Sequence, residues 1–496
     1  MEELNYTQAQ PAERPKIPAA DAAFAWAGLA LGFVFTHFAV RYFGGIWGGI
    51  FWALFGITGA VFVKVRGIGT TPFQKVIFAI AELFCLAPLF GSNVFVNFLA
   101  AAFSFMLYFY LTISISGGEL FGRHFILDLL QSVFARPFEN FARQPKSALS
   151  VFRGRTRSKN VLYAMLGLLT AVPLTIVVVL LLISSDEVFA NSMRDIAGYL
   201  PRFSFSLFWE ILFAVPLAMY FFGALFSVEK SAPVYGDCAP SYRVLPPIAA
   251  YFAVTPICVF YLIYIVIQFA NIAGALNKTL DYSKFARSGF FELCAIAVIN
   301  LGVIVLIQAF TKRKENDVKP LALRIYTVAL SLFTLLIIAT AVTKMLMYIN
   351  EYGMTLLRVY TSWFMALLAL VFVLIIVLQI HDYVIWKPLF AAFTVMFALL
   401  CFGNFEGMIA RYNISAYRSG ALEELDVDAF GELGYSAAAP AAELLENTSD
   451  VTLKTKLKNI LEEIKISDEY DDNFAYFSIP RAQAQAAMER VKGLMR

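Results

Sequence analysis

Runs of apolar residues long enough to cross a lipid bilayer recur along this chain of 496 residues. A helix needs about 20 apolar residues to span a hydrocarbon core of about 30 Å, and residues 161–183, 321–347 and 356–380 each reach that length. Only 15% of the residues are charged, whereas a soluble protein carries about 25%. These features predict an integral membrane protein that crosses the bilayer many times.

Apolar runs between charged breaks predict eleven spans and an all-α, polytopic helical membrane fold. The spans lie at residues 22–40, 46–63, 73–90, 93–116, 161–184, 204–228, 247–270, 288–310, 321–349, 356–380 and 388–405. Before them we expect a disordered segment (1–21), and after them a small acidic helical domain outside the membrane (406–496). Glycines four residues apart predict close helix packing in the first two spans. They are Gly28, Gly32, Gly44, Gly45, Gly48 and Gly49.

Lysine and arginine cluster in the loops after the second, fourth and eighth predicted spans. Because such clusters mark cytoplasmic loops, we expect the N-terminus in the cytoplasm and the C-terminal domain on the other side. The chain from residue 406 onward holds 10 basic and 16 acidic residues, which fits a different environment from that of the basic loops. The loop with Lys278, Lys284 and Arg287 argues against this orientation.

The segment 117–160 between the fourth and fifth spans is predicted to lie in the lipid headgroup plane. Apolar residues at helical spacing, from Phe121 to Phe134, stand opposite Arg123 and Asp128, a pattern typical of interfacial helices. The basic run that follows gives candidate contacts to anionic lipid headgroups. They are Arg153, Arg155, Arg157 and Lys159. The alternative, which we favour, is ordinary anchoring by positive charge on the cytoplasmic side.

Motifs that carry catalysis or cofactor binding are absent from the sequence. It has no HExxH, GxSxG, phosphate-binding loop or GxGxxG, and its five cysteines show no CxxC spacing. We therefore expect no catalytic residue, no cofactor and no metal. Since the basic stretches adjoin predicted spans, lipid is the simpler partner and nucleic acid is not expected. The C-terminal domain is a candidate surface for a protein partner.

Two glutamates inside the predicted spans, Glu82 and Glu210, are candidate ion or proton sites. A charge at the bilayer centre costs about 2.5–3.5 kcal/mol on insertion scales, so such residues usually face protein or water. Glu82 lies deepest, about 12 Å from either end of its span by the rise of a helix.

A second group of charges is expected near the outer surface. Glu292, Lys344 and Arg358 fall at similar depth in consecutive spans, close to Arg287 in the preceding loop. We hypothesise a polar cluster in which Glu292 pairs with Lys344, Arg358 or both. The alternative is that both cations extend to the interface while Glu292 caps a helix start.

The motif YxxxARxGFFEL, from Tyr282 to Leu293, is the most specific in the chain. Three further stretches accompany it: YLIYIVIQFANIAGAL (261–276), YGMTLLRVY (352–360) and IARYNI (409–414). Through them the chain resembles a bacterial membrane family called domain of unknown function 4173, related to one numbered 4153. The resemblance covers about residues 245–445. It implies a multi-pass protein of the bacterial cytoplasmic (inner) membrane and supplies no activity, cofactor or substrate.

Three classes of function stay open. An acidic external domain and a basic interfacial segment favour a non-enzymatic membrane sensor or scaffold. The spans, Glu82 and the outer cluster favour a transporter or channel for a small solute or ion. An intramembrane enzyme is the weakest reading, because no paired catalytic residues are present. We place the sensor or scaffold slightly ahead of the transporter.

Overall fold

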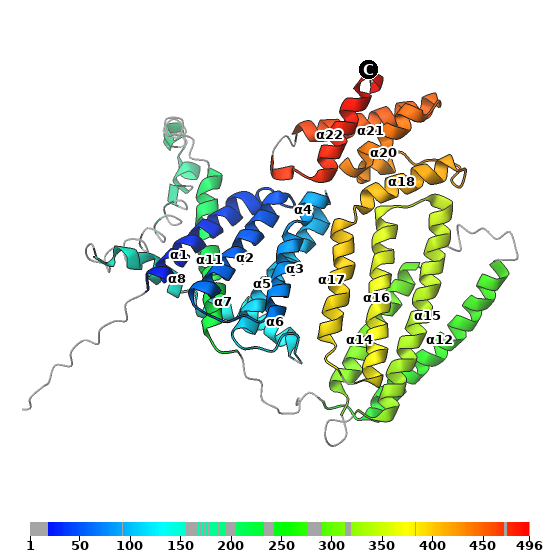
Figure 1. The fold of residues 1–496 in the computed structure, drawn as a ribbon, viewed down its shortest axis with the longest axis horizontal. Helices are drawn as coiled ribbons and strands as arrows, with labels where there is room; N and C mark the ends of the chain where they lie inside the picture. The colour runs from blue at the N-terminus through cyan, green and yellow to red at the C-terminus, as the bar shows by residue number, and fades with distance from the viewer. Residues whose placement is uncertain are drawn as a thin grey trace, which may run out of the picture.

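The computed structural model describes residues 18–91, 93–122, 124–154, 205–232, 243–275, 290–312, 319–381, 383–470 and 474–495, with scattered residues between 167 and 193. Over this part of the chain the regular elements are helices, and one isolated β-bridge joins Leu245 to Thr311. Two groups of long helices lie side by side, with shorter helices across one end (Figure 1). The predicted all-α fold is confirmed.

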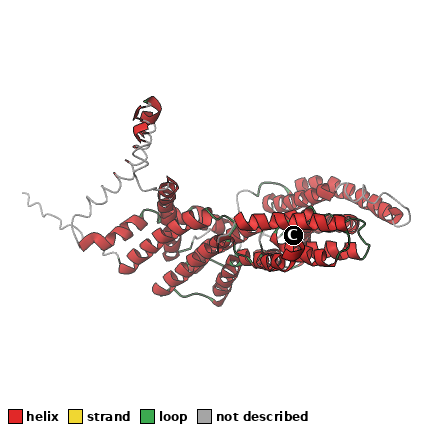
Figure 2. Ribbon diagram, turned by 90° about the horizontal axis from the view of Figure 1, so that it is seen from above, coloured by secondary structure: helices red, strands yellow, loops and turns green. Residues whose placement is uncertain are grey.

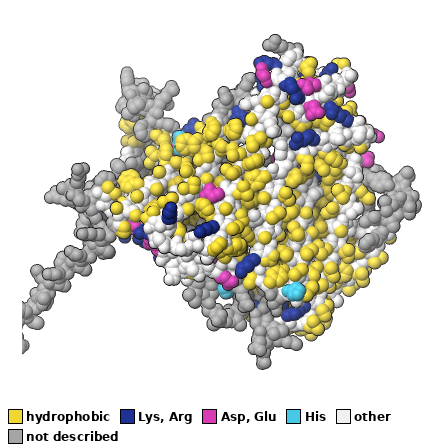
Figure 3. Space-filling view, in the orientation of Figure 1, with side chains coloured by type: hydrophobic (Ala, Val, Ile, Leu, Met, Phe, Trp, Pro, Cys, Tyr) yellow, Lys and Arg dark blue, Asp and Glu magenta, His cyan; other side chains and the backbone are white. Residues whose placement is uncertain are grey.

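Within the described residues, nine helices are long and apolar enough to cross a membrane. Helix α17 (Trp386–Phe402) adds a tenth candidate span when it is counted together with α18 (Phe405–Arg418), which follows it after a bend of 64°. These match ten of the predicted spans, whereas the one at 161–184 lies largely outside the described residues. Hydrophobic side chains cover the broad face in Figure 3, and charged side chains gather on the C-terminal helices. This distribution is typical of helices that face lipid along their length.

The N-terminal helix group is built around phenylalanine. Its elements are α1 (Ala19–Val34) with the π-helix η1 (Phe35–Val40), α2 (Ile46–Val65), α3 (Pro72–Cys85), α4 (Ala87–Phe90), α5 (Val94–Ile115), and α11 (Phe205–Phe226) with η3 (Ser227–Glu229). Rings such as Phe51, Phe109 and Phe222 are fully buried between these helices. Because α1 begins at Ala19, the last residues of the segment expected to be disordered are helical.

Small residues let these helices approach closely, as the glycine spacing predicted, with one exception. A Cβ atom at Gly32 would lie under 3.0 Å from the Ala214 carbonyl oxygen of α11. A Cβ atom at Gly49 would lie under 3.0 Å from the carbonyl oxygen of Cys85 in α3. Gly48 has no atom within 4 Å of its Cβ position. The prediction that Gly48 packs against another helix is therefore wrong, and it borders a cavity instead.

Residues 125–154 form short helices packed on the N-terminal group. They are α6 (Phe125–Phe134), α7 (Arg136–Glu139), α8 (Arg143–Ala148) and η2 (Leu149–Gly154). Phe125, Leu129 and Val133, on the face expected to meet lipid, pack against the protein core. Asp128, assigned to the opposite polar face, is buried. Protein therefore covers much of this apolar face, and Phe134, at 70% exposed, stays available to lipid.

The second helix group has a core of its own. It consists of α12 (Pro247–Ala275), α14 (Phe290–Phe310), α15 (Leu321–Tyr352) and α16 (Leu356–Ile380). The buried Asn300 accepts a hydrogen bond from the Tyr261 hydroxyl and donates one to Thr334 Oγ1, at 2.7 and 2.9 Å. Helix α17 joins the two groups, because its Phe397 stacks on Phe84 of α3 and its backbone accepts a hydrogen bond from Trp363 Nε1 of α16.

The C-terminal domain begins where the chain bends by 64° between α17 and α18. Its further elements are α19 (Ala429–Glu432), α20 (Tyr435–Asn447), α21 (Val451–Tyr470), η5 (Phe474–Tyr476) and α22 (Ile479–Met495). The Ser478 hydroxyl accepts a hydrogen bond from the Arg481 amide, as expected for a helix that begins there. Figure 2 shows these helices from above, with the C-terminus over the second helix group.

Opposite ends of the N-terminal group differ in chemistry. Asp21, Arg66, Arg143 and Glu229 form an ion-pair network at one end, which we call the network end. At the other, the domain end, Tyr42 in the turn after η1 and Trp47 at the start of α2 contact η5 through Tyr42–Tyr476 and Trp47–Phe474 ring pairs. The C-terminal domain and the ion-pair network thus lie at opposite ends of the helices.

Candidate functional site

Glu82 lies near the C-terminal end of α3, about 15 Å along the helix from Pro72 and near the middle of the apolar span Pro72–Phe90 that α3 and α4 form together. The start of this helix is fixed by Pro72 and by a capping box. The Thr71 amide donates to Gln74 Oε1 at 2.8 Å, and the Gln74 amide donates to Thr71 Oγ1 at 3.3 Å. The local sequence therefore places the carboxyl group at mid-membrane depth.

The carboxyl group of Glu82 lies against Gly56 of α2 and Tyr108 of α5. A Cβ atom at position 56 would lie under 3.0 Å from both Glu82 Oε1 and the Tyr108 ring, so glycine allows the three helices to meet there. The Tyr108 hydroxyl lies 3.6 Å from Cys85 Sγ. Glu82 Oε1 is buried and has no hydrogen-bond partner in the described part of the chain. An acceptor in this position can take a proton or a cation.

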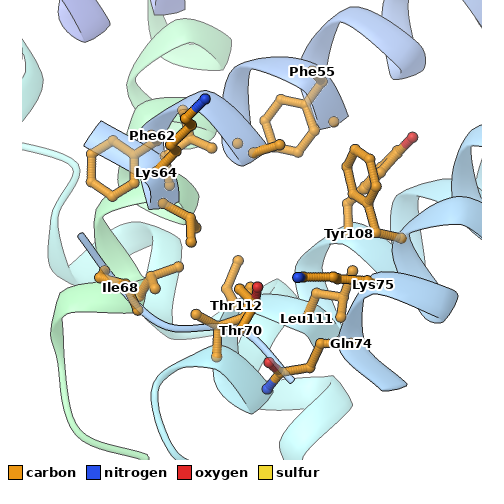
Figure 4. A pocket seen from close by; sticks show the side chains of 18 residues that line it. Phe55, Phe62, Lys64, Ile68, Thr70, Gln74, Lys75, Tyr108, Leu111 and Thr112 are labelled. Atoms are coloured by element: carbon orange, nitrogen blue, oxygen red, sulfur yellow. The ribbon is translucent and has the colours of Figure 1, made fainter. Parts of the chain in front are cut away.

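A cavity of about 420 Å³ lies between α2, α3, α5 and α11 toward the network end (Figure 4). We call it the lysine-end cavity, because Lys64 and Lys75 line it. Its inner wall includes Gly56 and Tyr108, so it reaches the surroundings of Glu82. Apart from the lysines, Thr70, Gln74 and Thr112, its lining is almost entirely apolar.

A second cavity, of about 570 Å³, lies toward the domain end. Gly44, Gly45, Gly48 and Gly49 line it, and we call it the glycine-end cavity. Its other walls come from η1, α5 and α11. Helices α2, α5 and α11 therefore line both cavities, one toward each end of the group.

Aromatic side chains separate the two cavities. This aromatic layer consists of Trp52, Phe55, Phe105, Phe109 and Phe221. The ring centres of Trp52 and Phe105 are 5.2 Å apart, those of Phe55 and Phe109 are 5.7 Å apart, and those of Phe55 and Phe221 are 5.4 Å apart. Phe55 borders the lysine-end cavity, whereas Trp52, Phe105 and Phe221 border the glycine-end cavity. Phe55, which borders one cavity, thus contacts Phe221, which borders the other.

Glu210 of α11 is paired with a residue that sequence reasoning missed. His37 Nδ1 lies 2.6 Å from Glu210 Oε2, and both side chains are largely buried. His37 belongs to η1, and single π-helical turns are frequent at functional sites. The available signal was the presence of one histidine and one glutamate in separate apolar spans, 173 residues apart. Their spacing gave no reason to pair them.

The outer cluster is only partly assembled. Lys344 is buried at 5% exposure and interacts electrostatically with Glu292 in the first turn of α14. Arg358 instead donates hydrogen bonds to the carbonyl oxygens of Tyr352, at 3.1 Å, and Gly353, and so caps the end of α15. Neither Glu292 nor Lys344 borders the cavity of about 200 Å³ beside Arg358. Arg287 lies outside the described residues.

The candidate headgroup contacts lie at the edge of the described chain. Arg153 belongs to η2, whereas Arg155, Arg157 and Lys159 lie outside the described residues. Across the described part, no group of three or more His, Cys, Asp or Glu side chains is placed to hold a metal ion. The candidate site therefore rests on Glu82, the His37–Glu210 pair and the two cavities.

The helices and these intramembrane ionisable groups define a multi-pass α-helical membrane protein. A protein-family model described as a domain of unknown function (DUF4153) matches residues 78–444, and the chain belongs to that family. In the sequence analysis, family 4153 entered only as a relative of family 4173. Membership of family 4173 stays a prediction. No curated protein and no solved structure matches the chain.

Proposed function

We propose that the protein moves a small solute or ion across the membrane along α2, α5 and α11. One observation carries the proposal: two cavities on the same three helices extend toward opposite ends and are separated by an aromatic layer. A carrier needs a mid-membrane site that is closed toward at least one side. The arrangement of the cavities supplies that geometry.

Glu82 is the proposed ion- or proton-binding group. It contacts Gly56, which follows Phe55 of the aromatic layer directly in α2. When Glu82 is ionised, the neighbouring Tyr108 hydroxyl can donate a hydrogen bond to it. Protonation or cation binding would remove a costly mid-membrane charge and is the proposed link between binding and opening of the layer. Glu210, held by His37, is the second proton-binding candidate.

The proposed location is the inner membrane of a bacterium, with the network end in the cytoplasm. Lys64, Arg66 and Lys75 lie at that end of α2 and α3, as the positive-inside rule favours. The C-terminal domain would then lie outside the cytoplasm. The glycine-end cavity would face the same side as this domain.

A membrane sensor or scaffold is the second candidate. The observation that favours it is the contact of η5 with the turn between α1 and α2, through Tyr42, Trp47 and their ring partners. Through this contact, binding of a partner to the C-terminal domain would change the packing of the N-terminal helices. This function needs neither cavity to hold water.

Thiol accessibility separates the two functions. Gly48→Cys and Ala60→Cys line different cavities on the same helix, about 18 Å apart by helical rise. They are made separately in a chain whose five native cysteines are serine. A membrane-impermeant maleimide is added to intact cells and to inside-out vesicles.

Transport predicts labelling of Gly48→Cys from outside and of Ala60→Cys from the cytoplasmic side. Ala81→Cys, at a fully buried position of α3, is the matched control and stays unlabelled from both sides. If both cavity positions react only after denaturation, the cavities are dry and transport along these helices is ruled out. The sensor or scaffold would then be the better account.

A further inference from the structure

The lysine-end cavity combines an apolar interior with cationic groups at one end. Phe55, Phe62, Phe78 and Leu111 contribute to its apolar walls. The space runs from the network end, where α2 finishes and α3 begins, toward Tyr108 at mid-membrane depth. A ligand that fills it must be apolar over most of its length.

Lys64 and Lys75 give the cavity a positive end. Both side chains border it, and Figure 4 shows the Lys75 ammonium group pointing into the space and the Lys64 ammonium group pointing toward its rim. Neither lysine has an ion pair with another described residue. Arg66, two residues from Lys64, is by contrast held in the network by Asp21 and Glu229. The acidic groups at this end therefore neutralise the arginines and leave the lysines for a ligand.

Uncharged polar groups lie beside the lysines. Thr70 and Gln74 line the cavity, and Gln74 Nε2 donates a hydrogen bond to Ser114 at 3.0 Å. The polar part of the lining thus lies near the network end of α3, where the candidate span Pro72–Phe90 begins. A lining that is charged at one end and apolar along the rest is complementary to a membrane amphiphile, which has a charged headgroup and a hydrocarbon chain.

We propose that the lysine-end cavity binds an anionic phospholipid from the surrounding bilayer, with its phosphate on Lys64 and Lys75 and one acyl chain between α2, α3 and α5. The inference rests on the proposed function only in using the same cavity, and it names the class of substrate or bound regulator. Lysine near a membrane surface attracts anionic lipid by about 1 kcal/mol per residue. Loss of both lysines should therefore weaken binding about thirtyfold.

The test uses the full-length protein in a neutral detergent, titrated with dioleoylphosphatidylglycerol and, separately, dioleoylphosphatidylcholine. Retained lipid is counted by native mass spectrometry. The wild type should retain one phosphatidylglycerol in preference to phosphatidylcholine. Lys64→Ala combined with Lys75→Ala should lose this preference. The control Lys146→Ala combined with Lys312→Ala, which removes two exposed lysines that do not line the cavity, should keep it.

A second variant tests the acyl-chain part of the site without changing charge. Ala60→Trp places an indole at the cavity wall and should weaken phosphatidylglycerol binding while both lysines remain. Equal retention of the two lipids, or equal losses in the two double-lysine variants, would overturn the proposal. Full competition by inorganic phosphate would also overturn it, because the apolar cavity would then contribute nothing.

Binding is measured here at equilibrium, so its outcome is independent of transport. A protein that binds the lipid but whose Gly48→Cys and Ala60→Cys positions stay dry would retain the lipid site and lose the transport function. If both cysteines are labelled as transport predicts but no lipid is retained, the transport proposal stands and the lipid site is ruled out.

Discussion

Glu82 Oε1 and the α-carbon of Gly56 lie so close that a Cβ atom at position 56 would come within 3.0 Å of the carboxyl oxygen. The same Cβ atom would also come within 3.0 Å of the Tyr108 ring. We predict that Gly56→Ala lowers the free energy of unfolding by about 1–3 kcal/mol through overpacking. Gly48→Ala, with open space at its Cβ position, should instead gain about 0.5–1 kcal/mol from the lower chain entropy of alanine. Thermal unfolding in detergent compares the two, and equal shifts would contradict the described contact.

The ion-pair network should stabilise the network end through Asp21. Its side chain is 2% exposed and is paired with both Arg66 and Arg143. Asp21→Asn should cost about 1–3 kcal/mol, because it removes the charge of a buried carboxylate, while Arg66 and Arg143 are partly exposed and stay paired with Glu229. Glu139→Gln, which breaks an exposed pair with Lys230, should cost less than about 1 kcal/mol. The stabilities are measured by denaturant unfolding, and a similar cost for both variants would show that the network is not buried in the membrane-bound protein.

Gly45 should control the docking of the C-terminal domain. A Cβ atom there would lie under 3.0 Å from the carbonyl oxygen of Ala475 in η5, so Gly45→Val should push η5 away from the turn. We expect limited proteolysis near residues 471–478 to become faster in Gly45→Val than in Gly48→Val. Unchanged cleavage would mean that η5 does not dock on this turn.

The outer charges should behave as one pair and one helix cap. A double-mutant cycle with Glu292→Gln and Lys344→Met should give a coupling energy of at least about 0.5 kcal/mol, since the two residues interact. The cycle of Glu292→Gln with Arg358→Met should give no coupling, because Arg358 binds backbone carbonyls of α15 and the following glycine. Coupling in the second cycle alone would reverse this assignment.

The spans could be predicted because each is a local property of the sequence. The apolar run at 356–380, for example, coincides with α16. The start of α22 is a local feature of the same kind, since Ser478 caps it and Pro480 stands in its first turn. Burial in lipid and helix capping depend on neighbouring residues alone.

Contacts between distant helices could not be predicted in the same way. Nothing in the local sequence of Glu210 points to His37 as its partner. The apolar residues of α6 could pack against lipid or against protein equally well. Only the three-dimensional fold shows that Phe125 packs against the protein core. Lys64 and Lys75 marked orientation in the sequence, whereas their shared cavity depends on how α2 and α3 pack.

The most direct test of the transport path is to open the aromatic layer and measure labelling of Ala60→Cys from the domain side. Phe109 is fully buried in the layer, so Phe109→Ala should connect the two cavities. Phe372→Ala is the control, because it removes an equally buried ring from the second helix group. We predict that an impermeant maleimide on the domain side labels Ala60→Cys rapidly with Phe109→Ala and remains excluded with Phe372→Ala and in the parent. Equal labelling from the domain side in all three chains, or in none of them, would contradict a path closed by this layer.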